Sequence, residues 1–155
     1  MTIVIAVDPG TTQSGYVVWN GKEVIKHLKE NNDIILKRLE FDPHGDDAVL
    51  VIEDIRSYGQ AVGQSVFETV WWSGRFYEVW PVGRVFRVPR TDVKMHLCHT
   101  LKKIGDSNIR QALIDRFEPD LKPKQRPVGI LKGITKDEWA SLALAVCFHD
   151  LRVRG

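Results

Sequence analysis

Short apolar runs that end in turns or polar residues dominate the first part of the chain. Residues 3–8 form one such run, which ends in Asp8, and a second run covers residues 15–20. This pattern predicts a β-hairpin whose first strand is buried. An Asn-Gly dipeptide follows, so we expect a short third strand over residues 23–27.

Helical and extended patterns alternate along the rest of the chain. We expect a helix over residues 33–40, a loop over 42–47, a buried strand over 48–52, a helix over 65–80, a strand over 84–88, and helices over about 92–101, 107–117 and 135–148. The last range is almost entirely apolar from Trp139 to Phe148, which is typical of a buried helix. This order predicts an α/β fold, a mixed sheet with helices on both faces.

Length and composition favour one ordinary globular unit. We expect a single domain over residues 1–155, with 43% apolar and 27% charged residues. No apolar stretch approaches the ~20 residues that span a bilayer, and the N-terminus lacks the pattern of a signal peptide. Two cysteines, Cys98 and Cys147, do not make a disulfide framework. We therefore expect a cytoplasmic protein with no membrane partner.

The net charge of +2 hides two halves of opposite sign. Residues 1–83 carry 7 Lys or Arg against 12 Asp or Glu, whereas residues 84–155 carry 15 against 8. A basic surface beside an acidic one suits an anionic polymer held near acidic metal ligands. The simpler alternative is an ordinary solvated surface.

Acidic residues stand at the ends of predicted buried elements. Asp8 and Glu53 each end an apolar strand, and Asp137 opens the last helix. Three carboxylates from such positions can meet at one sheet edge and hold Mg²⁺ or Mn²⁺, which prefer oxygen ligands. A pair of such ions stabilises the attacking water and the leaving oxygen in phosphodiester hydrolysis. In the alternative, Asp8 only caps a turn and Asp137 only favours the helix dipole.

Three segments resemble the motifs of the RuvC-type Holliday junction resolvases. They are the opening IAVDPGTTQSGY of residues 5–16, VIED of residues 51–54, and Asp137 with the ASLALA of residues 140–145. The stretches EDIRSYG (53–59) and DSNIRQAL (106–113) are closer still to short RuvC-like proteins of bacteriophages.

This resemblance implies a ribonuclease H-like fold and a metal-dependent endonuclease that nicks four-way junctions and other branched DNA. Asp8, Glu53 and Asp137 would be catalytic and would bind Mg²⁺ or Mn²⁺, with two ions per site and no other cofactor. The protein would act as a homodimer, because two strands must be cut and each protomer offers one site. A phage-encoded protein would work in the cytoplasm of the host.

One position departs from the family pattern. RuvC proteins have a fourth acid three residues after the one that matches Asp137, and this position is Ala140 here. Other acids are candidates to replace it: Asp54, Asp106 and Glu138. Thr135 and Glu138 also fit a capping box, and we favour this role for Glu138 over metal binding. Asp54 is expected to point away from Glu53, because neighbouring strand residues face opposite ways.

DNA contacts are expected from the basic half. The candidates for phosphate contacts are Lys94, Lys102, Lys103 and Arg110, which otherwise are solvated charges. Tyr58, in the loop after Glu53, is a weaker candidate for stacking on a base, with simple packing as the alternative. Trp71, Trp72 and Phe76 are expected in the core or in a dimer contact.

Two other functions remain open from the sequence. A non-catalytic junction-binding module is supported by Ala140 alone. Residues 8–12 (DPGTT) also resemble the phosphate-binding turn of actin-like and sugar-kinase-like nucleotide binders. Those proteins need a second domain to enclose ATP, which 155 residues do not supply.

Overall fold

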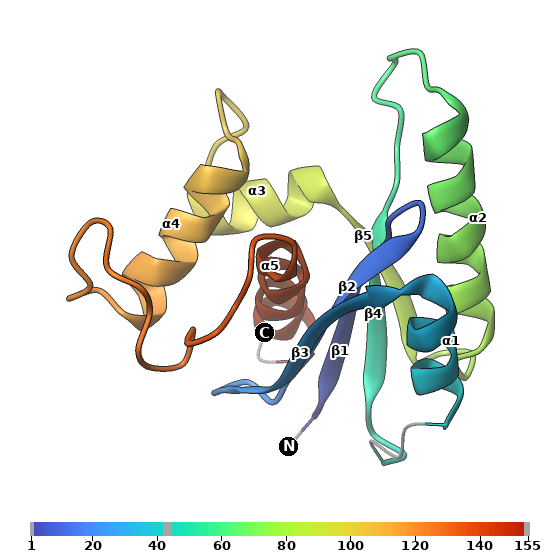
Figure 1. The fold of residues 1–155 in the computed structure, drawn as a ribbon, viewed down its shortest axis with the longest axis horizontal. Coiled ribbons are helices and arrows are strands. Elements are labelled where there is room, and N and C mark those ends of the chain that lie inside the picture. Colours follow the sequence, from blue (N-terminus) through green and yellow to red (C-terminus); the bar gives the residue numbers. More distant parts are fainter. Residues whose placement is uncertain (1, 42–44, 154–155) are drawn as a thin grey trace.

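The central strand of the fold is the first one in the sequence. The structure, a computed structural model, describes residues 2–41 and 45–153. One sheet has the strand order β3-β2-β1-β4-β5 (Figure 1). Its strands are β1 (Val4–Asp8), β2 (Gln13–Trp19), β3 (Val24–Asn31), β4 (Val49–Asp54) and β5 (Val85–Pro89). Strands β1, β2 and β3 pair antiparallel, whereas β1, β4 and β5 pair parallel.

Helices cover both faces of this mixed sheet, as the sequence predicts. The helices are α1 (Asn32–Phe41), α2 (Gln64–Glu78), α3 (Arg90–Cys98), α4 (Asp106–Phe117) and α5 (Glu138–Phe148). Helices α1 and α2 pack on one face, and α3, α4 and α5 lie on the other (Figure 1). Within the described ranges, no helix is long and apolar enough to cross a membrane.

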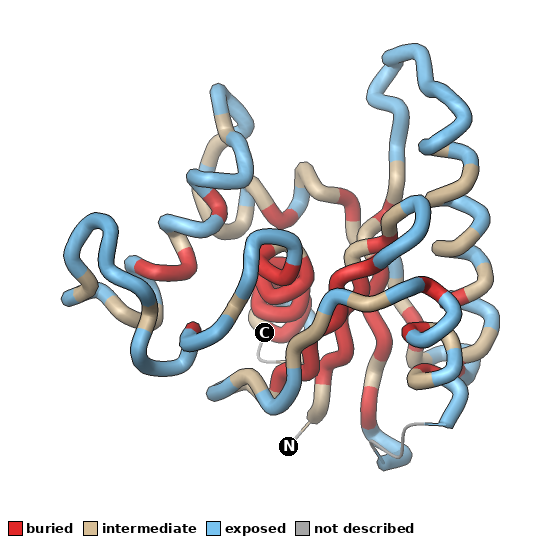
Figure 2. Tube along the Cα trace, viewed as in Figure 1, coloured by how far each residue is buried: buried red, intermediate tan, exposed pale blue. Residues whose placement is uncertain are grey.

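Burial on both faces explains the unbroken apolar runs. In β1, Val4 and Ala6 face the α5 side, whereas Ile5 and Val7 face α1 and α2, and none of the four is exposed. Helix α5 is buried along most of its length between the sheet and α3–α4 (Figure 2). This packing holds the start of α5 against the end of the sheet at which β1 and β4 terminate.

Several boundaries differ from the expectations. Strand β3 reaches Asn31 rather than 27, because the polar residues of its second half belong to a sheet-edge strand that needs only one buried face. Helix α3 ends at Cys98 rather than near 101, since His99 adopts a left-handed conformation. A π-helical turn, His149–Val153, continues α5 and was not expected. Residues 42–44 of the expected 42–47 loop lie outside the described residues.

Candidate active site

Three acids from distant sequence positions line one pocket at this sheet edge. Asp8 ends β1, Glu53 is the penultimate residue of β4, and Asp137 directly precedes α5. The parallel register pairs Val7 with Ile52, so Asp8 and Glu53 follow at the same edge. All three acids line this pocket, hereafter the carboxylate pocket. The expected convergence of strand ends and helix start is therefore seen.

Gly15 allows α5 to approach the sheet closely. Gly15 lies opposite Asp8 in the β1–β2 pairing. A Cβ atom at this position would lie 2.9 Å from the Asp137 carbonyl oxygen and 2.6 Å from Ser141 Oγ. Both separations are too short for a real side chain, so the absence of a Cβ sets the distance between the Asp137 backbone and β2.

The turn after Asp8 is held by a buried polar network. Ser14 Oγ accepts a hydrogen bond from the Gly10 amide at 3.1 Å and donates to Asn32 Oδ1 at 2.5 Å. Asn32 Nδ2 donates to the Gly10 carbonyl at 2.9 Å. Ser14 and Asn32 are both buried, so their polar atoms depend on these partners. The network fixes the direction in which the chain leaves Asp8.

The electrostatics of the carboxylate pocket disfavour a second negative charge beside Glu53. Burial, together with the charge of Glu53 and a hydrogen bond with it, raises the pKa of Asp8 to about 8. The charge of Asp137 adds a smaller increase, while Arg90 opposes it. A cation placed beside a carboxyl group in this environment would stabilise its charged form.

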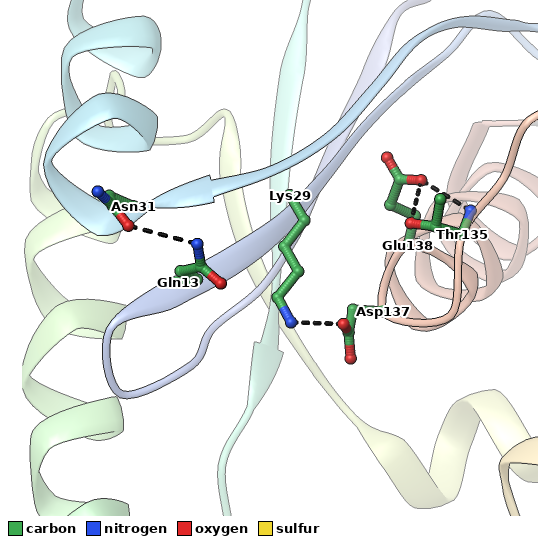
Figure 3. A network of polar contacts seen from close by, with 6 residues as sticks. All are labelled: Gln13, Lys29, Asn31, Thr135, Asp137 and Glu138. Atoms are coloured by element: carbon green, nitrogen blue, oxygen red, sulfur yellow. Dashed lines mark hydrogen bonds and ion pairs between the residues drawn. The ribbon is translucent and has the colours of Figure 1, made fainter.

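Basic side chains already pair with two of the acids. Arg90 Nη1 donates to Glu53 Oε1 at 3.3 Å, and its Nη2 forms an ion pair with Asp106. Lys29 of β3 donates to Asp137 (Figure 3). Among the described residues, no three His, Cys, Asp or Glu side chains are already grouped as a metal site.

The donor set nevertheless fits a hard divalent cation. Asp8, Glu53 and Asp137 offer oxygen ligands only, as Mg²⁺ and Mn²⁺ prefer. Burial and the neighbouring Glu53 raise the pKa of Asp8, so a cation beside this carboxyl group would favour its charged form. Lys29 and Arg90 each pair with one of these acids, so a cation that binds the acids would have to displace them. The residues are therefore consistent with an ion between these three carboxylates.

The structure separates the candidates for the missing fourth acid. Ala140 lines the carboxylate pocket, and of the three candidates only Asp106 does so too. Asp54 points away, as strand alternation predicts, and accepts hydrogen bonds from Arg56 at 2.9 Å and from Arg87. These two arginines outweigh the effect of burial and lower the pKa of Asp54.

Both carboxylate oxygens of Glu138 already have partners beside the start of α5. One carboxylate oxygen accepts hydrogen bonds from the Thr135 amide at 2.8 Å and the Thr135 hydroxyl at 2.6 Å (Figure 3). The other oxygen lies 2.8 Å from His27 Nδ1. Glu138 is buried and does not line the carboxylate pocket. The expected capping box is only half present: Glu138 accepts the Thr135 amide, but its own amide bonds the Thr135 carbonyl, and Asp137 is the residue that precedes the helix. Both oxygens of Glu138 that would bind a metal have partners.

The expected DNA-binding residues lie around the carboxylate pocket rather than in it. Lys94 is on α3, and Lys102 and Lys103 are exposed in the turn between α3 and α4. Arg110 is on α4, with its guanidinium 5.1 Å from the centre of the Trp139 ring. Tyr58 is 52% exposed in the loop between β4 and α2. This loop and the α3–α4 turn project on opposite sides of the strand ends (Figure 1).

Sequence reasoning missed the cations of the pocket. Arg90 and Lys136 line it, and Lys29 holds Asp137. Arg90 directly follows β5, so a third parallel strand also ends in a charged residue at this edge. The sequence carries this signal, because Arg90 stands two residues beyond the expected strand over 84–88. Lys29 carries no such signal, because the sequence predicts that the third strand stops at residue 27.

Comparisons with solved structures match almost the whole chain. Thermus thermophilus RuvC in complex with a Holliday junction substrate gives a TM-score of 0.66 at 16% identity, covering 99% of this chain and 96% of that one. Another Thermus thermophilus RuvC structure gives 0.62 at 17% identity, covering 98% and 95%. No protein-family model and no curated protein sequence matches the chain. The chain therefore has the ribonuclease H-like fold of RuvC structures.

Proposed function

We propose that this protein is a metal-dependent endonuclease that nicks four-way DNA junctions and other branched DNA. The observation that carries the proposal is the meeting of Asp8, Glu53 and Asp137 in one pocket, at the strand ends of a RuvC-like fold. Placing the largely buried carboxyl groups of Asp8 and Glu53 beside one another is costly, so their placement needs a functional reason. Phosphodiester hydrolysis with divalent ions supplies that reason.

Asp8, Glu53 and Asp137 would hold the metal ions. When bound, Mg²⁺ or Mn²⁺ supplies Lewis-acid stabilisation of the charge that develops on phosphate oxygens, and two ions per site are expected. Arg90 and Lys136 line the same pocket and would bind non-bridging phosphate oxygens. Asp106, at the start of α4, would add the acid that Ala140 does not provide. The Ser14–Asn32 network would keep Asp8 in place during the reaction.

The surroundings of the pocket fit a branched polyanion. Lys94, Lys102, Lys103 and Arg110 would contact phosphates on the α3–α4 side. Tyr58, on the opposite loop, would stack on an exposed base at the junction centre. In the Thermus protein, a solved complex holds a Holliday junction substrate. That neighbour supports branched DNA as the substrate class.

A homodimer would supply the second active site. Phe67 and Trp71 are 59% and 62% exposed on α2, and Val70 beside them is 46% exposed. Phe76 is in the core, so α2 has one buried and one exposed apolar face. We call the exposed face, formed by Phe67, Val70 and Trp71, the α2 stripe. A second copy of the chain packed on this stripe would place two sites on one junction.

The deciding experiment is Mg²⁺-dependent nicking of a labelled synthetic four-way junction. Asp8→Asn should abolish nicking, about 1000-fold or more, because a ligand and its charge are lost. Junction binding measured in parallel should survive. Asp33→Asn, an exposed acid at the start of α1, is the matched control and should cut normally. Full Mg²⁺-dependent activity in Asp8→Asn would reject the assignment.

The same assay separates a second candidate function. A non-catalytic junction-binding module is favoured by Ala140 at the fourth acidic position. Wild-type protein that binds the junction but makes no nicks at any Mg²⁺ or Mn²⁺ concentration would support that module. A nucleotide binder would instead show thermal stabilisation by ATP, which the nuclease proposal does not expect.

A further inference from the structure

The function proposed so far uses Asp106, Arg110 and Lys136 but assigns no ligand to the groove that these residues line beside the carboxylate pocket. It lies between α4 and the segment 118–136, which we call the basic loop, and has a volume of about 750 Å³. This volume is within the range of clefts that enclose small ligands. The groove and the carboxylate pocket share Asp106, Lys136 and Trp139 in their linings. An extended polymer ligand that occupies the groove can therefore continue directly to the three acids.

The basic loop is held in place by its own residues. The Glu118 carboxylate accepts hydrogen bonds from the amides of Val128 and Gly129 at 2.9 Å and of Leu131 at 3.1 Å. These three bonds outweigh the effect of burial and lower the pKa of Glu118. The Leu131 side chain is fully buried in the core. The loop therefore forms an ordered wall of the groove, so binding a ligand there loses little further conformational entropy of the loop.

The groove lining combines positive charge with apolar surface. Its charged members are Arg110, Lys122, Lys124, Arg126 and Lys136, and its apolar members include Ile114, Leu121 and Ile134. A carboxylate in the lining, Asp106, lies at the end that opens on the active site. Positive charge alone attracts any phosphate backbone, but apolar walls add affinity only for exposed bases.

We infer that this groove binds an unpaired DNA strand next to the phosphate that is cut. The inference rests on the proposed nuclease function and deepens it, because it assigns single-stranded character to the substrate near the cleavage point. A duplex keeps its bases stacked inside, so it cannot present them to the apolar walls of the groove. A single strand presents phosphates to the lysines of the basic loop and bases to the apolar walls.

Binding without cleavage tests the groove directly. The probe is a fluorescein-labelled oligo-dT of ~12 nucleotides, followed by anisotropy with the full wild-type chain in EDTA. Lys124→Glu and Arg126→Glu should each weaken binding about tenfold at low salt, because each replaces a phosphate contact with repulsion. Lys37→Glu, an exposed lysine on α1 at the opposite face of the sheet, should leave the affinity unchanged. Glu118→Gln, which weakens the loop anchor without removing a groove charge, should also reduce affinity.

Further probes separate this groove from a general phosphate surface. A duplex of equal length should bind more weakly, and the groove variants should affect it less. An abasic strand of equal charge should bind several-fold more weakly than oligo-dT, because apolar walls have no base to contact. Equal affinity for the abasic strand, or an equal loss for the duplex in Lys124→Glu, would overturn the inference.

The junction-nicking assay keeps the two proposals distinguishable. If wild-type protein nicks junctions but the groove variants bind oligo-dT normally, the groove inference fails and the nuclease proposal stands. If oligo-dT binding depends on the groove but no junction is nicked at any metal concentration, the nuclease proposal fails and the groove remains a single-strand site.

Discussion

At the scale of single residues, a missing side chain matters as much as a present one. Gly15→Ala would push a methyl group against the Asp137 carbonyl, which lies 2.9 Å from the ideal Cβ position. We expect cleavage to fall about 100-fold, since a shift of roughly 1 Å in a catalytic ligand has that effect. Junction binding should change little. Gly63→Ala, where a Cβ meets open space, is the control, and equal activities in both variants would contradict this view.

Arg90 is a second residue whose role is measurable without catalysis. It pairs with the carboxylates of Glu53 and Asp106 and would therefore compete with a metal ion for these groups. In Arg90→Ala the metal-free protein should melt about 2–4 °C lower, because the repelling acids lose a partner worth about 1 kcal/mol. Mg²⁺ should raise the melting temperature more in the variant than in the wild type, as followed by differential scanning fluorimetry. An identical Mg²⁺ effect in both proteins would exclude competition between Arg90 and the metal.

The acids were predictable at this scale, but their partners were not. Asp8 and Glu53 end apolar runs, and parallel strands place such ends at one edge, so their meeting follows from pattern alone. Lys29 reaches Asp137 only because β3 extends to Asn31 and α5 lies across the sheet. Such a contact depends on tertiary distances, which no local pattern reports. Only the folded chain likewise shows that Asp106, and neither Asp54 nor Glu138, lines the carboxylate pocket.

At the scale of elements, Asp150 ties three of them together. It follows α5 in the π-helical turn, and its carboxylate accepts hydrogen bonds from His96 Nε2 of α3 at 2.8 Å and from Arg116 Nη2 of α4 at 2.8 Å. Burial raises the pKa of Asp150, but these partners outweigh it and hold the pKa below its ordinary 3.8. The helices on the α5 side of the sheet are thus joined by one carboxylate.

This arrangement makes stability depend on pH in a definite direction. A carboxyl group with a lowered pKa in the folded state stabilises the protein above its unfolded pKa, and this contribution is lost as pH falls through the folded pKa. Asp150→Asn should lower the melting temperature by about 5 °C at neutral pH. Between about pH 6 and pH 3 the variant should lose less further stability than the wild type in thermal denaturation. Parallel profiles of melting temperature against pH in the two proteins would show that Asp150 does not cause this pH dependence.

The elements also show which patterns were ambiguous. Helix α2 has aromatic residues on two sides, and helical periodicity does not say which side is buried. The structure buries Phe76 and leaves Trp71 exposed. Helix α3 lacks a glycine at its end, and His99 takes the left-handed position in its place. Strong apolar runs such as those of β1 and α5 were predictable, because burial on all sides leaves no alternative.

At the scale of the whole molecule, the α2 stripe should control assembly. Trp71→Glu would place a charge in the proposed contact between two copies, and we expect the dimer dissociation constant to rise at least about thirtyfold. Sedimentation velocity measures this directly, and paired nicking of a junction should fall with it. Ile25→Glu, at an equally exposed apolar position on β3, should leave assembly unchanged. A dimer that survives Trp71→Glu unaltered would move the interface elsewhere.

The order of elements in the sheet has a consequence for the protein during its synthesis. β1 is translated before the other strands yet lies at the centre of the sheet, and α5, which covers β1 and β2, is translated after all five strands. Asp8 therefore leaves the ribosome long before Asp137, and the core around β1 closes only when α5 has emerged. A nascent or truncated chain holds at most two of the three acids in place. Under the proposed function, a partly made chain would therefore be inactive because of the topology of the fold itself.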